Sequence, residues 1–236
     1  MKKLFSIVVF SIAFVGSVKA QYYYDRSKNP DKIPNQPKQT RSRSSSSSSS
    51  NYSKFIFAAW DGNKPMSNSS FIDQSSSLGA RFGFRKRLND EDKFWVGGDL
   101  SWSVYNQYFP YQTYTTGTQS VSTDLYDYAY NYGLTVNIDY FFLPMEKLVV
   151  PYAGFGIGIA YDKFNQYYNI YGDTPSDSWG LLVRPEVGVL IGYKQNSRWR
   201  LKAAVHYDYS SNTNSTYGYK GFTNAGLQIG ILKMIR

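Results

Sequence analysis

The most regular stretch of the chain reads LYDYAYNYGLTVNIDYFF, from Leu125 to Phe142. Its even-numbered positions are apolar or aromatic, whereas its odd-numbered positions are mostly small or polar. The two sets are Tyr126, Tyr128, Tyr130, Tyr132, Leu134, Val136, Ile138, Tyr140 and Phe142, against Asp127, Ala129, Asn131, Gly133, Thr135, Asn137 and Asp139. Side chains alternate between two faces only along an extended chain, so this period of two predicts a β-strand with one apolar and one polar face.

The same alternation recurs along the rest of the chain and predicts an all-β fold. The clearest repeats are Leu78–Leu88, Lys93–Asn106, Leu148–Asp162, Trp179–Tyr193, Arg198–Ser210 and Phe222–Leu232, and a less clearly phased strand is expected at Lys54–Trp60. Together with Leu125–Phe142 these segments give about eight strands. Pro185 falls inside one of them and cannot donate a backbone hydrogen bond, so a bulge or local break is expected between Arg184 and Glu186.

Connections between the predicted strands alternate between short and long. Short turns fall at Leu88–Asp92, Leu143–Lys147 and Lys194–Ser197, and long loops at Asp61–Ser77, Gln107–Asp124, Lys163–Ser178 and Ser211–Lys220. This pattern is typical of an antiparallel up-and-down transmembrane β-barrel, whose long loops face outside. An even number of strands would return both chain ends to the periplasmic side.

The first fifty residues differ in composition from the rest. A basic start, the apolar run Leu4–Val15 and the small residue Ala20 predict a secretory signal peptide at 1–20. Residues 21–50 contain six Lys or Arg, two Asp and the serine tract Ser44–Ser50. Such a segment buries too little apolar surface to fold, so a flexible, basic periplasmic segment is expected ahead of a barrel at 51–236. Two interpretations of residues 21–50 stay open: the segment contacts an acidic partner, or it is only a solvated spacer.

Composition excludes several classes of protein. The absence of Cys excludes disulfides, thiolate metal sites and a lipid-modified N-terminal cysteine. The net charge of +9 lies largely in residues 1–50, and an exported chain does not meet genomic nucleic acid, so no nucleic-acid partner is expected. No apolar run after Ala20 is long enough for a transmembrane helix, so any membrane span must consist of strands.

Alternation alone leaves two barrels open, a soluble lipocalin-like barrel with an apolar interior and a membrane barrel with an apolar outer wall. Aromatic residues on the apolar face fall near both ends of the strands, with aliphatic residues between them. Those near the short turns are Phe94, Tyr140, Phe142, Tyr193 and Trp199, and those toward the long loops are Trp102, Tyr126, Tyr161, Trp179, Tyr207 and Tyr209. Two aromatic girdles around an aliphatic band favour a wall that faces lipid.

The opposite face carries small residues and charges, which are then expected to point into the barrel. Its ionisable members are Arg81, Arg85, Asp99, Asp139, Arg184, Glu186, Arg200, Lys202 and His206. The interior of an eight-stranded barrel is only wide enough for side chains. These groups are therefore expected to pair across a filled lumen rather than to line a pore.

With this strand pattern and topology, Tyr52 to Arg236 resembles the small bacterial outer-membrane β-barrels, including the eight-stranded type with a closed interior. Gln21, directly after the predicted cleavage site, is similar to exported proteins of the Bacteroidetes. The resemblance implies localisation in a Gram-negative outer membrane. Members of the family commonly end in an aromatic residue, whereas this chain ends Lys233-Met234-Ile235-Arg236.

No residue pattern identifies a reaction, and no catalytic residue, metal or cofactor is expected. His206 is the only histidine, which excludes a metal site built on several imidazoles. Some barrels of this architecture resemble lipid hydrolases with Ser and His on the outer wall, and Ser210 lies near His206 in the sequence. Alternation, however, turns His206 into the lumen beside Asp208, away from any lipid head group.

Three functions stay open. The preferred one is a structural or accessory component of an envelope protein complex, which would bind partners through its outer wall, its loops or its basic segment. The second is a passive channel or a surface ligand or adhesion receptor, because the loops are rich in tyrosines that suit protein or glycan recognition, although such rings also pack on one another. The third is a lipid-modifying enzyme. Outer-membrane lipid is an expected partner in all three.

Overall fold

The computed structural model describes residues 52–67, 71–88, 93–116, 118–168, 171–172, 175–213, 218 and 220–236. The signal peptide predicted at 1–20 and the basic segment predicted at 21–50 lie outside the described residues. No helix in the described part of the chain is long and apolar enough to cross a membrane.

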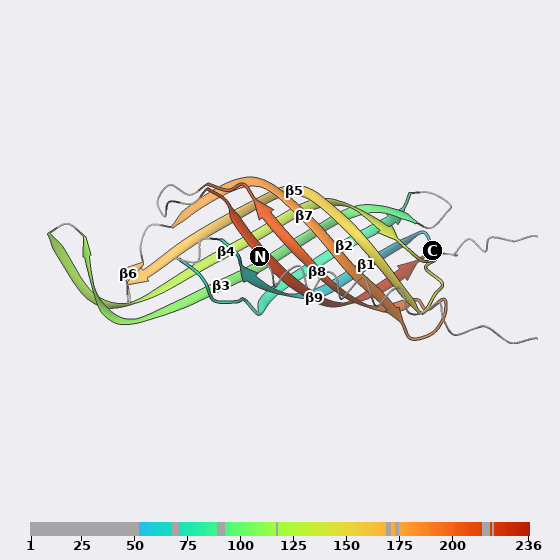
Figure 1. The fold of residues 1–236 in the computed structure, drawn as a ribbon, viewed down its shortest axis with the longest axis horizontal. Helices are drawn as coiled ribbons and strands as arrows, with labels where there is room; N and C mark the ends of the chain where they lie inside the picture. The colour runs from blue at the N-terminus through green and yellow to red at the C-terminus, as the bar shows by residue number, and fades with distance from the viewer. Residues whose placement is uncertain are drawn as a thin grey trace, which may run out of the picture. The chain divides into compact units, whose positions relative to one another are not determined.

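Nine strands occur among these residues, and eight of them close into a barrel (Figure 1). They are β1 (Lys54–Pro65), β2 (Leu78–Arg87), β3 (Phe94–Thr116), β4 (Gln119–Phe141), β5 (Val149–Tyr168), β6 (Tyr171–Gly172), β7 (Ser176–Gly192), β8 (Trp199–Ser210) and β9 (Phe222–Ile235). Each long strand pairs antiparallel with the next, and β9 pairs with β1 to close the wall. The short β6 pairs only with the end of β5. The predicted up-and-down barrel of about eight strands is thus confirmed.

The wall of the barrel is apolar outside and polar inside. Leu134, Val136 and Val187 on the outer face are 55%, 63% and 56% exposed, whereas Arg81 and Arg184 on the inner face are 0% and 2% exposed. A lipocalin-like soluble barrel has the opposite polarity, because its apolar side chains are buried in its interior. The arrangement therefore excludes that alternative and suits a wall surrounded by acyl chains.

Strands β3 and β4 are longer than predicted and form a projecting hairpin (Figure 1, green). The prediction of a long loop at Gln107–Asp124 is wrong, because this segment continues both strands. Cross-strand contacts explain the extension: Thr113 bonds Ser122 at 2.8 Å, and the ring centroids of Tyr108 and Tyr126 lie 4.8 Å apart. The ladder shifts register once, between Phe109 and Gln112, where Pro110 and Tyr111 form the irregularity. We call residues 105–116 and 119–128 the hairpin extension.

The phase of β1 could not be assigned from the sequence, and the structure resolves it. Phe55, Phe57 and Ala59 point inward, whereas Ile56 and Trp60 are exposed on the outer wall. Both faces of this strand are apolar, because its inner face contributes to an apolar cluster inside the barrel. The order of apolar and polar residues in β1 therefore does not show which of its side chains point into the barrel.

Pro185 produces the expected local break but no bulge. On the β5 side the ladder runs unbroken through the Phe155–Pro185 pair. On the β8 side the pairs at Arg184 and Pro185 are missing, while the pairs on either side keep one register. The missing proline N–H thus interrupts one ladder without inserting an extra residue.

Gly97 and Gly98 on β3 offer a matched test of strand packing. A Cβ at Gly97 would overlap the backbone carbonyl of Phe84 on β2, whereas a Cβ at Gly98 would meet its nearest atom at 3.4 Å. We expect Gly97→Ala to lower the free energy of unfolding by about 2–3 kcal/mol, because the strands must move apart. Gly98→Ala should change it by less than about 0.5 kcal/mol. Urea unfolding in detergent micelles measures both values, and equal effects would contradict this packing.

Candidate functional site in the closed lumen

The lumen consists of three layers of side chains. At the short-turn end an apolar cluster fills the barrel, formed by Tyr52, Phe55, Phe57, Ala59, Trp95, Phe141, Met145, Val150, Tyr152, Leu190, Ala204, Leu232 and Met234. At the long-loop end a smaller cluster contains Phe71, Ile72, Tyr105, Ala129, Phe164 and Phe222. Charged side chains occupy the space between them. Both ends of the barrel interior are thus filled by buried apolar groups.

Glu186 on β7 is the centre of the charged layer. Its carboxylate accepts from Arg81 Nη1 at 2.7 Å and from Lys202 Nζ at 2.9 Å. The Tyr152 hydroxyl donates to it at 2.5 Å and Gln228 Nε2 at 3.2 Å. One buried carboxylate therefore joins side chains from β2, β5, β8 and β9.

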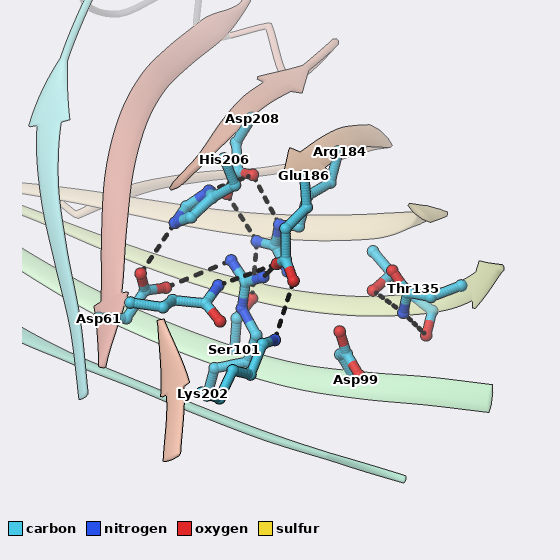
Figure 2. Close-up of polar contacts among 12 residues, drawn as sticks. Asp61, Asp99, Ser101, Thr135, Arg184, Glu186, Lys202, His206 and Asp208 are labelled. Carbon is cyan, nitrogen blue, oxygen red and sulfur yellow. Dashed lines mark hydrogen bonds and ion pairs between the residues drawn. The ribbon is translucent and has the colours of Figure 1, made fainter. Parts of the chain in front are cut away.

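A second group surrounds His206 on β8 (Figure 2). The imidazole Nε2 lies 2.8 Å from Asp61 Oδ1 and Nδ1 lies 3.0 Å from Asp208 Oδ1. Arg184 binds Asp208 through Nε and Nη2, both at 2.6 Å. Arg184 and Asp208 face each other where Pro185 interrupts the β7–β8 ladder, so this bidentate ion pair connects the strands where backbone bonds are missing.

A third group lies toward the apolar cluster of the short-turn end. Arg85 on β2 contacts Asp99 at 2.5 Å and Asp139 at 2.7 Å. The guanidinium carbon also lies 5.6 Å from the centre of the Phe57 ring. All three charged side chains are almost fully buried.

The structure brings together eight of the nine lumen residues named from the sequence. Arg200 lies apart, because its guanidinium donates to the backbone carbonyls of Lys147 and Met145 in a short turn. Asp61 and Asp208 belong to the charged layer but were absent from that set. Asp61 was missed because the first strand was expected to end at Trp60 and Asp61 was assigned to the following loop, whereas β1 continues to Pro65. The position of Asp208 next to His206 was visible in the sequence.

The residues predicted as aromatic girdles lie on the outer wall in two groups. Near the short turns, Phe94 contacts Tyr140 at a centroid distance of 5.0 Å and Tyr140 contacts Phe142 at 5.2 Å. Nearer the long loops, Tyr161 contacts Trp179 at 4.8 Å. The remaining members, Trp102, Tyr193, Trp199, Tyr207 and Tyr209, are exposed on the same wall. Tyr126 lies farther out, in the hairpin extension.

A tyrosine-lined groove of about 440 Å³ lies on the outer face of β4 and β5. It is lined by Tyr126, Tyr128, Tyr130 and Tyr167. The rings support one another, because Tyr128 contacts Tyr130 at 6.3 Å and Tyr167 at 5.8 Å. All four tyrosines therefore lie on paired strands, including Tyr167, which the sequence analysis assigned to the loop at Lys163–Ser178.

Asp127 in the hairpin extension gives this region a pH dependence. Burial raises the pKa of its carboxyl to about 6, although Gln166 Nε2 donates to it at 2.9 Å. Its contribution to the stability of the extension is complete below pH 4, the ordinary range of the group, and is lost as pH rises through about 6.

We therefore expect amide exchange in the extension, corrected for its intrinsic pH dependence, to increase between pH 5 and pH 7. In Asp127→Asn this increase should disappear, because the amide does not titrate. The exposed Asp73→Asn serves as the control. Identical pH profiles for Asp127→Asn and the unchanged protein would contradict the assignment.

The fold and the lumen together define a class, the closed eight-stranded barrel with an apolar wall and a charge-filled interior. The chain shares this fold with small outer-membrane β-barrels. Neisserial surface protein A (NspA) superposes with a TM-score of 0.50 and 17% identity, over 77% of this chain and 97% of that one. Ail, the attachment invasion locus protein of Yersinia pestis, superposes with a TM-score of 0.46 and 11% identity, over 78% of this chain and 97% of that one.

The outer membrane protease OmpT from Escherichia coli also matches, with a TM-score of 0.46 and 7% identity over 79% of this chain and 97% of that one. No protein-family model and no curated protein sequence matches the chain. The match to NspA shows a shared fold, and at identities of 7–17% no activity carries over from one protein to another.

Proposed function

We propose that this protein is an outer-membrane β-barrel with a filled lumen, exported by a cleaved signal peptide, that serves as a structural or accessory component of an envelope protein complex. In this arrangement its chain ends lie in the periplasm. The observation that carries the proposal is the combination of an apolar outer wall with an interior occupied by paired charges. Such a barrel offers its wall, its hairpin extension and its basic N-terminal segment to partners, but no path for solutes.

The filled lumen makes a direct prediction about transport. Purified protein inserted into planar bilayers should give no conductance steps above the baseline, because apolar clusters occupy both ends of the interior. An open porin inserted from the same detergent serves as the positive control. Regular single-channel steps that scale with the amount of inserted protein would contradict the proposal and favour a channel.

Membership of a complex is tested by cross-linking in intact cells followed by capture in mild detergent. Full-length protein is compared with a variant that keeps residues 1–20 but lacks 21–50. Retention of one stoichiometric partner by both forms would assign the contact to the barrel, and loss with the deletion would assign it to the basic segment. If neither form retains a stoichiometric partner, the accessory role fails while the barrel fold stands.

A surface receptor is the second candidate, and the tyrosine-lined groove favours it. Tyrosine side chains lose little rotamer entropy on binding and combine an apolar ring with a hydroxyl, which suits glycans or proteins. Replacing Tyr128 and Tyr167 with serine should abolish binding of a surface ligand while leaving partner capture unchanged. Unchanged ligand binding together with lost partner capture would favour the accessory role.

The geometry around His206 argues against a lipid-modifying enzyme. Both imidazole nitrogens face buried carboxylates, and the Ser210 hydroxyl donates to Asp162 and to the Phe222 carbonyl instead. We therefore infer that Ser210 and His206 do not act as a nucleophile and base.

A further inference from the structure

Three lysines form an outward-facing group at the short-turn end of the wall. Lys54, Lys86 and Lys233 lie on the neighbouring strands β1, β2 and β9, and all three are exposed. Lys54 lies directly opposite Lys86 in the ladder, and Lys233 lies opposite Ile56, two positions from Lys54. We call these residues the lysine triad.

The lysine triad carries three positive charges on one short stretch of the wall. In the described part of the chain no carboxylate forms an ion pair with any of the three. Like charges directly opposite each other in a ladder repel, and a charge on a lipid-facing wall is unfavourable unless it reaches the head-group region. An anion bound between the lysines would remove both penalties.

Apolar hollows flank the lysine triad on both sides. One, of about 800 Å³, lies over β7, β8 and β9 and is lined by Leu148, Ile191, Tyr193, Trp199, Leu201 and Ile231. The Trp199 ring forms its boundary with the triad, since Lys233 Nζ lies 5.3 Å from the ring centre. The other, of about 610 Å³, begins at Lys86 and continues along Phe84 and Val96.

The order of these groups along the wall matches an amphiphile. The lysine triad lies nearest the short turns. The hollow beside Trp199 begins at the same level and reaches Leu201 and Ile231, and the hollow at Lys86 extends to Leu134 and Ile159 in the middle of the wall. A charged head at the rim with acyl chains directed inward is how a phospholipid lies in one leaflet. The short-turn end is the periplasmic end in the proposed orientation, so the lipid belongs to the inner leaflet.

We propose that the wall carries a binding site for an anionic phospholipid of the periplasmic leaflet. The phosphate lies among Lys54, Lys86 and Lys233, and an acyl chain occupies the hollow beside Trp199. The site recognises negative charge, because three exposed ammonium groups lie on adjacent strands there, and it does not require a particular head-group sugar or amine.

The experiment compares two triple variants of the full chain. Lys54→Gln, Lys86→Gln and Lys233→Gln together remove the triad. Lys64→Gln, Lys163→Gln and Lys220→Gln make the same change in net charge at the long-loop end. Native mass spectrometry of protein released from detergent counts retained lipid during titration with phosphatidylglycerol or phosphatidylcholine.

We expect the unchanged protein and the long-loop variant to retain phosphatidylglycerol in preference to phosphatidylcholine. An anionic surface attracts each nearby lysine by about fivefold in affinity. Loss of the triad should therefore reduce that preference at least about tenfold, and a triple arginine variant at the same positions should restore it. Equal losses in the two glutamine variants, or no preference in the unchanged protein, would overturn the site. Tighter retention of lipid A than of phosphatidylglycerol by the triad would overturn its assignment to the periplasmic leaflet.

The inference rests on the proposed membrane location of the wall. Insertion of all variants into phosphatidylcholine vesicles, followed by the gel-mobility change on heating, tests that location separately. A barrel that inserts normally but shows no lipid preference loses the site and keeps the proposed function.

Discussion

Replacing Glu186 with alanine is expected to lower the free energy of unfolding by about 3–5 kcal/mol. The substitution leaves Arg81 and Lys202 buried without their carboxylate, and it also removes the acceptor for the Tyr152 hydroxyl. The penalty arises mainly from these unpaired charges rather than from the energy of the ion pairs themselves.

The measurement is urea unfolding in detergent micelles, followed by tryptophan fluorescence and by the mobility change on gels. Asp73→Ala is the control, because Asp73 is exposed and should change the unfolding free energy by less than about 0.5 kcal/mol. An unchanged midpoint for Glu186→Ala would show that the charged layer is hydrated rather than dry. That result would also reopen the possibility of a water path through the barrel.

Replacing Arg85 with alanine is expected to be at least as damaging, with a loss of about 3–5 kcal/mol or failure to fold. Asp99 and Asp139 would then remain buried on adjacent strands with no cation between them. Arg85→Lys should recover only part of the loss, since an ammonium group cannot reproduce the bidentate contact with Asp99.

A charge-free combination separates repulsion from packing at this position. Arg85→Met with Asp99→Asn and Asp139→Asn removes all three charges and keeps similar volumes. Its stability should return to within about 1–2 kcal/mol of the unchanged protein, because no unpaired charge remains. If the triple variant is as unstable as Arg85→Ala, the guanidinium packing on Phe57 outweighs the charge pairing.

The strand pattern was readable from the sequence wherever one face was apolar and the other polar. Leu125–Phe142 met that condition, and β4 contains this segment except for its last residue, Phe142. The loop predicted at Gln107–Asp124 failed because tyrosine and threonine alternate weakly with serine and glutamine, and no described side chain from Tyr108 to Ser122 is buried. Where no face is buried, hydrophobic periodicity does not distinguish strand from loop.

The inner face was only partly predictable. Charged residues such as Arg81 and Glu186 stood out because alternation placed them opposite apolar neighbours. The apolar end of the lumen did not, since Trp95 and Phe57 face inward between residues that are also apolar. The pairing of the charges depends on the register of every strand with its neighbours around the closed wall. The residue pattern of a single strand contains no information about that register. The girdle residues stay a prediction about the membrane interface.

The partners in the charged layer are far apart in sequence, and this has a consequence for how the protein assembles. Arg81 and Glu186 are separated by 105 positions, and Asp61 and His206 by 145. They meet only after the first and last strands have joined, so a half-assembled sheet would expose unmatched ionised groups to hydrocarbon. Pairing of β1 with β9 and expulsion of water from the barrel interior should therefore occur in one concerted step, with few stable partial structures in the bilayer.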